Sequence, residues 1–168
     1  LLQKPTKGDK INASISLRFG DENSLMNKSE VASLLAEMLK TGTTNRTKKQ
    51  ISDELDKIKT NISFSGAPNG LGITISTDKA NLPAALALLE DLLKNPKFDE
   101  AEFEKLKLEN KAGIEANKND PQYIAGEKLS KLTTNYPKGH PLYASSSDED
   151  LEDLAKVKID DLKKFYAD

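Results

Sequence analysis

The sequence predicts an α+β domain in which helices pack on one face of an antiparallel β-sheet. The first observation is a strict alternation of apolar and polar residues over positions 11–20, which is typical of a half-buried strand. The second is a pair of shorter alternating runs, at residues 62–64 and 71–75, separated by the turn-forming residues 66–70. The third is that nearly all of the chain after residue 80 has the apolar spacing of helices.

The N-terminal region is expected to contain strands joined by turns. Leu1 and Leu2 are interpreted as the end of an earlier strand, which Pro5 terminates and residues 7–9 turn back. Residues 11–19 form the next strand, and residues 20–23 turn the chain into a helix. The runs at 62–64 and 71–75 are predicted to pair as a hairpin, so three or four strands are expected in all.

A helix is predicted around residues 27–43, because its apolar residues recur at the spacing of one helix face: Val31, Leu34, Leu35, Met38 and Leu39. Asn27 and Glu30 have capping-box spacing at its start. Gly42 is expected to close its end in the left-handed conformation.

The remaining helices are predicted from apolar faces that follow polar starting residues. One helix ends near Lys59, another ends at Asn95 and Pro96, and a long one runs to about Asn119. A further helix after Asp120 and Pro121 carries Ile124, Leu129 and Leu132. The other predicted starting residues are Thr47 with Gln50, Asn81, Asp99 with Glu102, Ser147 or Asp148, and Asp160.

Composition predicts a single soluble domain spanning residues 1–168, because no linker, repeat or low-complexity tract divides the chain. Lys and Arg number 25 against 27 Asp and Glu, and this balance argues against nucleic acid as a partner. No apolar run approaches the ~18 residues that a membrane span requires. The absence of cysteine excludes disulfides, thiolate zinc ligands and thiol nucleophiles.

Catalytic chemistry is poorly represented in the sequence. His140 is the only histidine, it lies in a predicted loop, and no G-x-S-x-G elbow is present, so a structural or solvated histidine is expected. One histidine without cysteine does not supply the three ligands of a catalytic zinc site. The acidic residues at 148–153 lack the glycine and spacing of a calcium loop, and the helix dipole explains them.

Residues 38–43, M-L-K-T-G-T, resemble the M-L-x-x-G-T segment that follows the H-x-x-E-H zinc motif of pitrilysin and insulinase-type metallopeptidases. Other stretches resemble the same family in the same order, namely R-F-G-D-E at 18–22, Pro96 with Phe98, and Y-P-K-G-H-P at 136–141. Together they span almost the whole chain.

The resemblance places the zinc motif on residues that have lost its chemistry. The two motif histidines fall on Ser33 and Glu37, and the catalytic glutamate falls on Ala36. The third zinc ligand of the family, a glutamate on a later helix, falls on Gly113, 76 residues after Glu37. These four residues are interpreted as vestigial positions, with no zinc expected in this chain and no substrate-binding residue assigned.

The resemblance implies the inactive second half of a long bacterial enzyme, often periplasmic, whose parent is a zinc metalloendopeptidase. The chain is then a fragment of a larger multi-domain protein, cut at both ends where the family has further strands. Its expected partners are a zinc-bearing catalytic half, in the same or another chain, and unfolded peptide, which an exposed strand edge could bind by β-addition. A periplasmic location is expected, with the cytoplasm left open.

Two other functional hypotheses remain at this point. One is a structural or assembly subunit without a role in proteolysis, similar to the inactive subunits of respiratory complexes and processing peptidases. The other is an enzyme that uses Glu37 or His140 in unrelated chemistry. An H-x-x-E-H motif elsewhere in the parent chain favours a fused peptidase, and its absence favours the assembly role.

Overall fold

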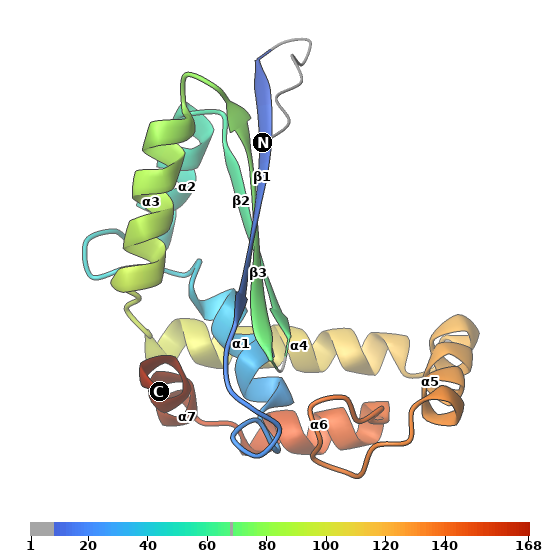
Figure 1. Ribbon diagram of the computed structural model, residues 1–168. Helices are drawn as coiled ribbons and strands as arrows, with labels where there is room; N and C mark the ends of the chain where they lie inside the picture. Colours follow the sequence, from blue (N-terminus) through green and yellow to red (C-terminus); the bar gives the residue numbers. More distant parts are fainter. Residues whose placement is uncertain (1–8, 68) are drawn as a thin grey trace.

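The computed structural model describes residues 9–67 and 69–168, and it confirms the predicted α+β class. Three strands form one antiparallel sheet in the order β1-β3-β2, with β1 at Lys10–Arg18, β2 at Asn61–Ala67 and β3 at Gly70–Asp78 (Figure 1). The predicted hairpin is therefore β2 and β3. The strand expected at Leu1 and Leu2 lies outside the described residues.

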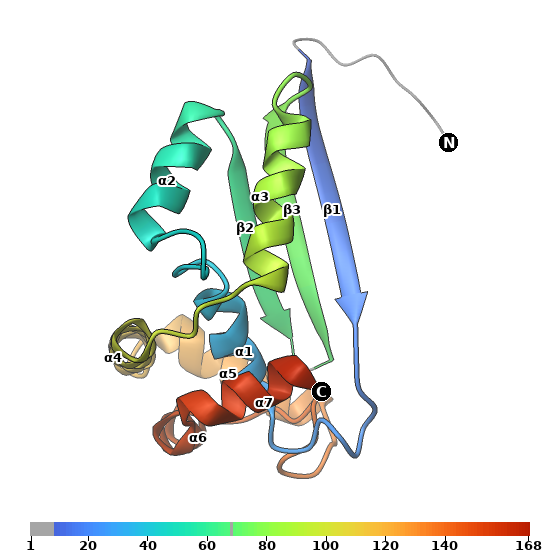
Figure 2. The same cartoon turned by 90° about the vertical axis from the view of Figure 1, so that its left-hand side faces the viewer.

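One face of the sheet is covered by α2, Lys48–Lys57, and α3, Leu82–Lys94 (Figure 2). Ile62, Ile73 and Ile75 point into this layer, where they are buried with Ile51 of α2 and a set of α3 residues: Ala85, Leu88, Leu89 and Leu92. The alternate positions on the strands are polar and exposed: Asn12, Ser14, Ser16, Ser63, Ser65, Thr74 and Ser76. The alternation of apolar and polar residues in the sequence therefore reflects a sheet with one packed face and one solvated face.

A second core lies at one end of the sheet, around α1, Ser29–Met38. This helix packs on β2 and is surrounded by α4, Glu100–Asn117, α6, Ser147–Lys156, and α7, Ile159–Ala167 (Figure 1). Its buried residues include the predicted apolar stripe, in contact with residues of the other three helices: Phe103, Leu106, Leu154, Val157, Ile159 and Leu162. The stripe of α1 is therefore central to this core.

Helix α5, Pro121–Thr133, lies at the far end of α4 and buries none of its residues (Figure 1). Its existence was predicted correctly, with Asp120 accepting hydrogen bonds from the backbone N–H groups of Gln122 and Tyr123. The leucines that suggested a packed face, Leu129 and Leu132, are 61% and 85% exposed. The apolar face of this helix has no partner among the described residues.

The predicted ends of α1 are wrong. Asn27 does not cap the helix, because its backbone is left-handed, with φ of 59°, and its N–H donates to the Gly139 carbonyl at 2.7 Å. At the other end the helix stops at Met38, whose carbonyl accepts from the Thr41 hydroxyl at 2.8 Å. Gly42 instead forms a β-bridge with Thr47.

The other helix starts are mostly close to prediction. Thr47 with Gln50 forms the expected capping box, and Asp99 accepts from two backbone N–H groups of the first turn of α4. Asn81 occupies the N-cap position of α3 without a side-chain capping bond. The cap of α6 is Ser146 rather than Ser147 or Asp148, α7 begins at Ile159 after Lys158, and α4 ends at Asn117 rather than near Asn119.

Candidate functional site

The residues of the degenerate motif lie on α1, where positions i, i+3 and i+4 share one side of a helix. Ser33 and Glu37 are half-buried, and Ala36 is almost fully buried at 1% exposure. Gly113 lies on α4, and a Cβ atom built there would meet nothing within 4 Å. The fold therefore leaves room for a side chain at Gly113 and almost none at Ala36.

Glu37 and Gly113 line the same shallow concavity, about 340 Å³ in volume, between α1, α4 and the start of α5. Its wall is completed by Glu109, Asn110, Ile114, Asn117 and Tyr123. Ser33 and Ala36 are not among the lining residues. The structure thus brings together two of the four positions that the sequence singled out.

A hydrogen bond joins α1 to α4 at this concavity. The Asn110 side-chain amide donates to a Glu37 carboxylate oxygen at 3.1 Å and to the Leu106 carbonyl at 3.0 Å. Both donor positions of one amide nitrogen are thereby used. No motif or spacing in the sequence pointed to Asn110, because its role depends on the packing of two helices that are distant in the chain.

The other side of Ala36 is closed by strand β2. A Cβ atom placed on Gly66 would lie 2.5 Å from the Ala32 carbonyl oxygen and 3.0 Å from the Ala36 Cβ. Separations under 3 Å are not tolerated without movement of the backbone, so Gly66 permits the close contact of β2 with α1. A carboxylate at position 36 would have to displace this contact.

The residues at this site do not fit a zinc ion. Of the four positions only Glu37 carries a zinc-binding group, and that carboxylate is engaged with Asn110. Within residues 9–67 and 69–168 no group of three or more His, Cys, Asp or Glu side chains is arranged to hold a metal ion. A catalytic zinc site needs three such ligands, so no zinc-dependent step is assigned to this chain.

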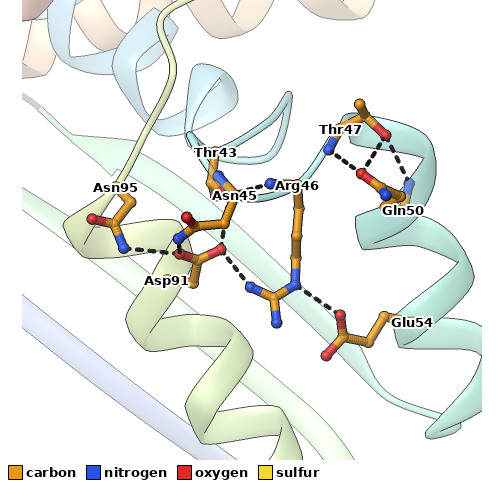
Figure 3. A network of polar contacts seen from close by, with 8 residues as sticks. All are labelled: Thr43, Asn45, Arg46, Thr47, Gln50, Glu54, Asp91 and Asn95. Atoms are coloured by element: carbon orange, nitrogen blue, oxygen red, sulfur yellow. Dashed lines mark hydrogen bonds and ion pairs between the residues drawn. The ribbon is translucent and has the colours of Figure 1, made fainter.

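The segment after α1 is fixed by a polar network centred on Asp91 of α3 (Figure 3). The carboxylate accepts from Thr43 at 2.8 Å, Asn45 at 2.5 Å, Arg46 at 2.7 Å and Asn95 at 2.8 Å. Burial raises the pKa of Asp91, but these four donors outweigh burial and lower it to about 2.

Arg46 extends the network to α2 through Glu54 at 2.8 Å (Figure 3). The loop between α1 and α2, the second half of α2 and the C-terminal part of α3 are thereby held together. The G-T pair that suggested the family resemblance includes Thr43, so part of that motif serves this connection. An acidic residue within the apolar spacing of α3 is the signal by which Asp91 could have been found.

His140 occupies a buried loop position, with 7% of its surface exposed. Its ring stacks on Tyr136 with 4.1 Å between centroids, and its Nδ1 accepts from the Leu142 backbone N–H at 2.9 Å. Its Nε2 lies 3.4 Å from a carboxylate oxygen of Glu22. The two ring nitrogens thus contact a backbone N–H of the same loop and a carboxylate of the segment before α1. Neither contact pairs a nucleophile with a base.

A family model and a curated relative both match most of this chain. The family model for Insulinase (Peptidase family M16) matches residues 2–146. A Helicobacter pylori protein named Non-peptidase homolog YmxG is 28% identical over 156 residues, which cover 91% of this chain and 35% of that protein. The chain therefore spans about a third of the length of this curated relative.

Three solved structures share the fold. The peptidase M16 inactive domain from Pseudomonas fluorescens superposes with a TM-score of 0.79 at 21% identity, covering 97% of this chain and 39% of that chain. A protease from Helicobacter pylori gives 0.72 at 20% identity over 97% and 39%, and a conserved protein from Enterococcus faecalis gives 0.69 at 15% over 94% and 40%. At these identities the similarity concerns the fold.

Within the part of the chain that the structure describes, no helix is both long and apolar enough to cross a membrane. The motif of residues 38–43, the arrangement of α1 and α4 around one concavity, and the match of the family model over residues 2–146 lead to one conclusion: this chain belongs to the insulinase family of peptidases, family M16.

Proposed function

We propose that this chain is a non-catalytic M16 domain that packs against a zinc-bearing half and helps to enclose an unfolded peptide. The observation that carries the proposal is the concavity between α1 and α4, where Glu37 and Gly113 lie together without a set of zinc ligands. The names of two relatives, a non-peptidase homolog and an inactive domain, support a non-catalytic role. Residues 1–168 then act as one domain of a longer protein or assembly.

Strand β2 offers a way to hold an extended peptide. It is an edge strand, paired only with β3 within the described residues, and Ser65, Gly66 and Ala67 at its end are exposed. Edge strands bind extended peptides through main-chain hydrogen bonds. Because β2 packs on α1, a peptide added there would run beside the helix of the degenerate motif.

Peptide binding can be tested with two matched glycine variants. Gly113 and Gly126 both lie in helices with open space around the Cβ position, but only Gly113 lines the concavity. We expect Gly113→Tyr to weaken binding of a fluorescent unfolded peptide by roughly tenfold, because the ring fills part of the site. Gly126→Tyr serves as the control and should bind as the original chain does.

The measurement is fluorescence anisotropy with and without a metal chelator. The proposal is supported if the peptide binds equally well with and without the chelator and if only Gly113→Tyr weakens this binding. Equal binding by both variants would place the peptide elsewhere, and absence of binding would remove the peptide-enclosing role.

A structural or assembly role is the second candidate, and the exposed apolar side chains of α5 favour it. Such a subunit would bind an M16 partner without binding peptide. Co-purification with a zinc-bearing half, combined with the anisotropy measurement, separates the two roles.

A further inference from the structure

Four carboxylates from three helices, one of them Asp161 of α7, share a pocket on the side of α1 that faces α6. Glu30, in the first turn of α1, lines this space of about 330 Å³ together with Asp150 and Asp153 of α6. The Glu30 side chain is half-buried and makes neither an ion pair nor a hydrogen bond with the described residues. This end of the contact between α1 and α6 therefore holds a carboxyl group without a compensating partner.

Two of the three lysines that line the pocket pair with other carboxylates, and the third, Lys28, makes no ion pair with Glu30. Lys156 binds Asp153 at 2.7 Å, and Lys138 lies 3.2 Å from Glu149. Other ionisable groups line the pocket or act on Glu30, and they come from α1, α6, α7 and the segments before α1 and α6: Lys28, Glu37, Lys138, His140, Tyr143, Lys156 and Asp161. The carboxylates that face Glu30 thus remain a source of repulsion.

Burial is the main reason that a negative charge on Glu30 is unfavourable. It raises the pKa of Glu30 to about 7, with further contributions from Asp150, Asp153 and Glu37. Burial also raises the pKa of Asp150. The N-terminus of α1 favours a negative charge, but burial is the largest effect on this carboxyl group and prevails.

The apolar contacts beneath this pocket connect it to the core. Val31, one residue after Glu30, is buried in the same cluster as Leu154 and Val157, which lie on and just after α6. Charge repulsion between Glu30 and Asp150 would therefore act directly on the surface where the two helices meet.

We propose that the contact between the first turn of α1 and α6 is a proton-controlled latch, which is tight when Glu30 is neutral and loosens when Glu30 ionises. The stability of the closed state relative to the open state then falls as pH rises through neutrality, because the open state binds the proton less strongly than the closed state does. Glu30 and Glu37 are seven residues apart on α1 and so lie on the same side of the helix, two turns from each other, and the state of the latch therefore also affects how firmly α1 is held beside the concavity.

Hydrogen exchange of the α6 amides tests the latch. After correction for the intrinsic exchange rate, protection of residues 147–156 should fall about tenfold between pH 6 and pH 8 in the original chain. Glu30→Gln keeps the shape without the charge, so its protection should remain high and nearly constant. Glu100→Gln, in the exposed first turn of α4, is the matched control and should behave as the original chain does.

His140 lines the same pocket, and the Glu30→Gln variant distinguishes its contribution from that of Glu30. An equal loss of protection in Glu30→Gln would overturn the proposal. A second measurement needs no variant: the carboxyl carbon of Glu30, followed by NMR, should titrate with a midpoint near 7. A midpoint near the ordinary glutamate value of about 4.3 would equally refute the latch.

Discussion

At the scale of single residues, a few side chains in the interior decide how the loops around α1 are held. The buried Asp91 carboxylate accepts hydrogen bonds from four donors in two segments, the loop of residues 43–46 and Asn95 at the end of α3, and its negative charge strengthens each of these bonds. Gly66 matters because it has no side chain, which allows β2 to lie close to α1. Both residues matter because of neighbours that are distant in the sequence.

Replacing Asp91 by Asn should lower stability and alter its dependence on acid. The pKa of Asp91 in the folded chain is about 2, below the ordinary 3.8, so its stabilising effect is present above pH 3.8 and is lost as pH falls towards 2. We expect Asp91→Asn to cost about 1 kcal/mol at pH 7 after allowance for solvent screening.

Urea unfolding at several pH values measures this difference, which should shrink between pH 4 and pH 2. Asp53→Asn, which removes an exposed carboxylate paired with Lys49, is the control and should change little. A constant difference between Asp91→Asn and the original chain across this range would contradict the prediction.

Two glycine-to-alanine changes should have opposite signs. Gly66→Ala places a methyl group 2.5 Å from the Ala32 carbonyl, so we expect a loss of about 1–3 kcal/mol. Gly113→Ala adds a methyl group in open space within a helix, where alanine is favoured over glycine by roughly 0.5–1 kcal/mol. Thermal unfolding of both variants checks the prediction, and a shift in the same direction for both would contradict it.

At the scale of elements, helices with similar apolar spacing differ in how much of their apolar surface is buried. The leucines of α6 and α5 follow similar spacing, yet Leu154 is 2% exposed and Leu132 is 85% exposed. Spacing predicts that a helix forms with one apolar side, whereas burial depends on whether another element reaches that side. Helix α5 is held by polar contacts instead, such as those from Ser147 to Glu127 at 3.0 and 3.1 Å.

Substitutions on these two helices should separate their roles. Leu154→Ala should cost about 2–5 kcal/mol, because it leaves a cavity in the core around α1. Leu132→Glu should change the free energy of unfolding by less than about 0.5 kcal/mol. Denaturant unfolding of the isolated chain measures both, and a large loss from Leu132→Glu would mean that α5 packs on another part of the chain.

Element boundaries show what sequence spacing leaves undecided. Ser146 and Ser147 both precede acidic residues by three positions, so either could start α6 with a capping box. The structure uses Ser146 with Glu149, because the Ser147 N–H and hydroxyl both donate to Glu127, twenty residues earlier in the chain. Asn27 likewise does not cap α1, because its backbone N–H donates to the Gly139 carbonyl. Local patterns predicted the elements well, and long-range contacts set their ends.

At the scale of the whole molecule, α1 is the centre of one of the two cores, which meet at Phe64, Leu71 and Leu93, and one side of α1 faces the concavity. The family resemblance implied that Glu37 and Gly113, 76 residues apart, belong to one site, and the structure shows them lining one space. The sequence could not reveal the Asn110 hydrogen bond or the close approach of Gly66 to α1, since both depend on how separate elements pack.

Restoring ligands at these positions should restore metal binding. A variant with Ser33→His, Glu37→His and Gly113→Glu supplies three zinc ligands, and we expect its zinc affinity to exceed that of the original chain by at least roughly tenfold. Adding Ala36→Glu should leave zinc affinity nearly unchanged, because that residue is not a ligand, but should reduce stability at its buried position.

Competition with a zinc-sensitive dye after dialysis measures these affinities, with Gly126→Glu in place of Gly113→Glu as the control. The original chain should retain no stoichiometric zinc. If the three-ligand variant binds no better than its control, the alignment of Gly113 or the geometry between α1 and α4 is mistaken.

The strand order β1-β3-β2 also has a kinetic consequence. The hairpin of β2 and β3 closes a short loop, whereas β1 pairs with residues 52 to 68 positions later in the chain, beyond α1 and α2 in the sequence. Because closing a long loop costs entropy before its contacts form, the hairpin can assemble early and β1 must join late. By the same argument β1 is the strand whose departure begins unfolding, which makes the edge of the sheet opposite β2 the slowest part of the molecule to form.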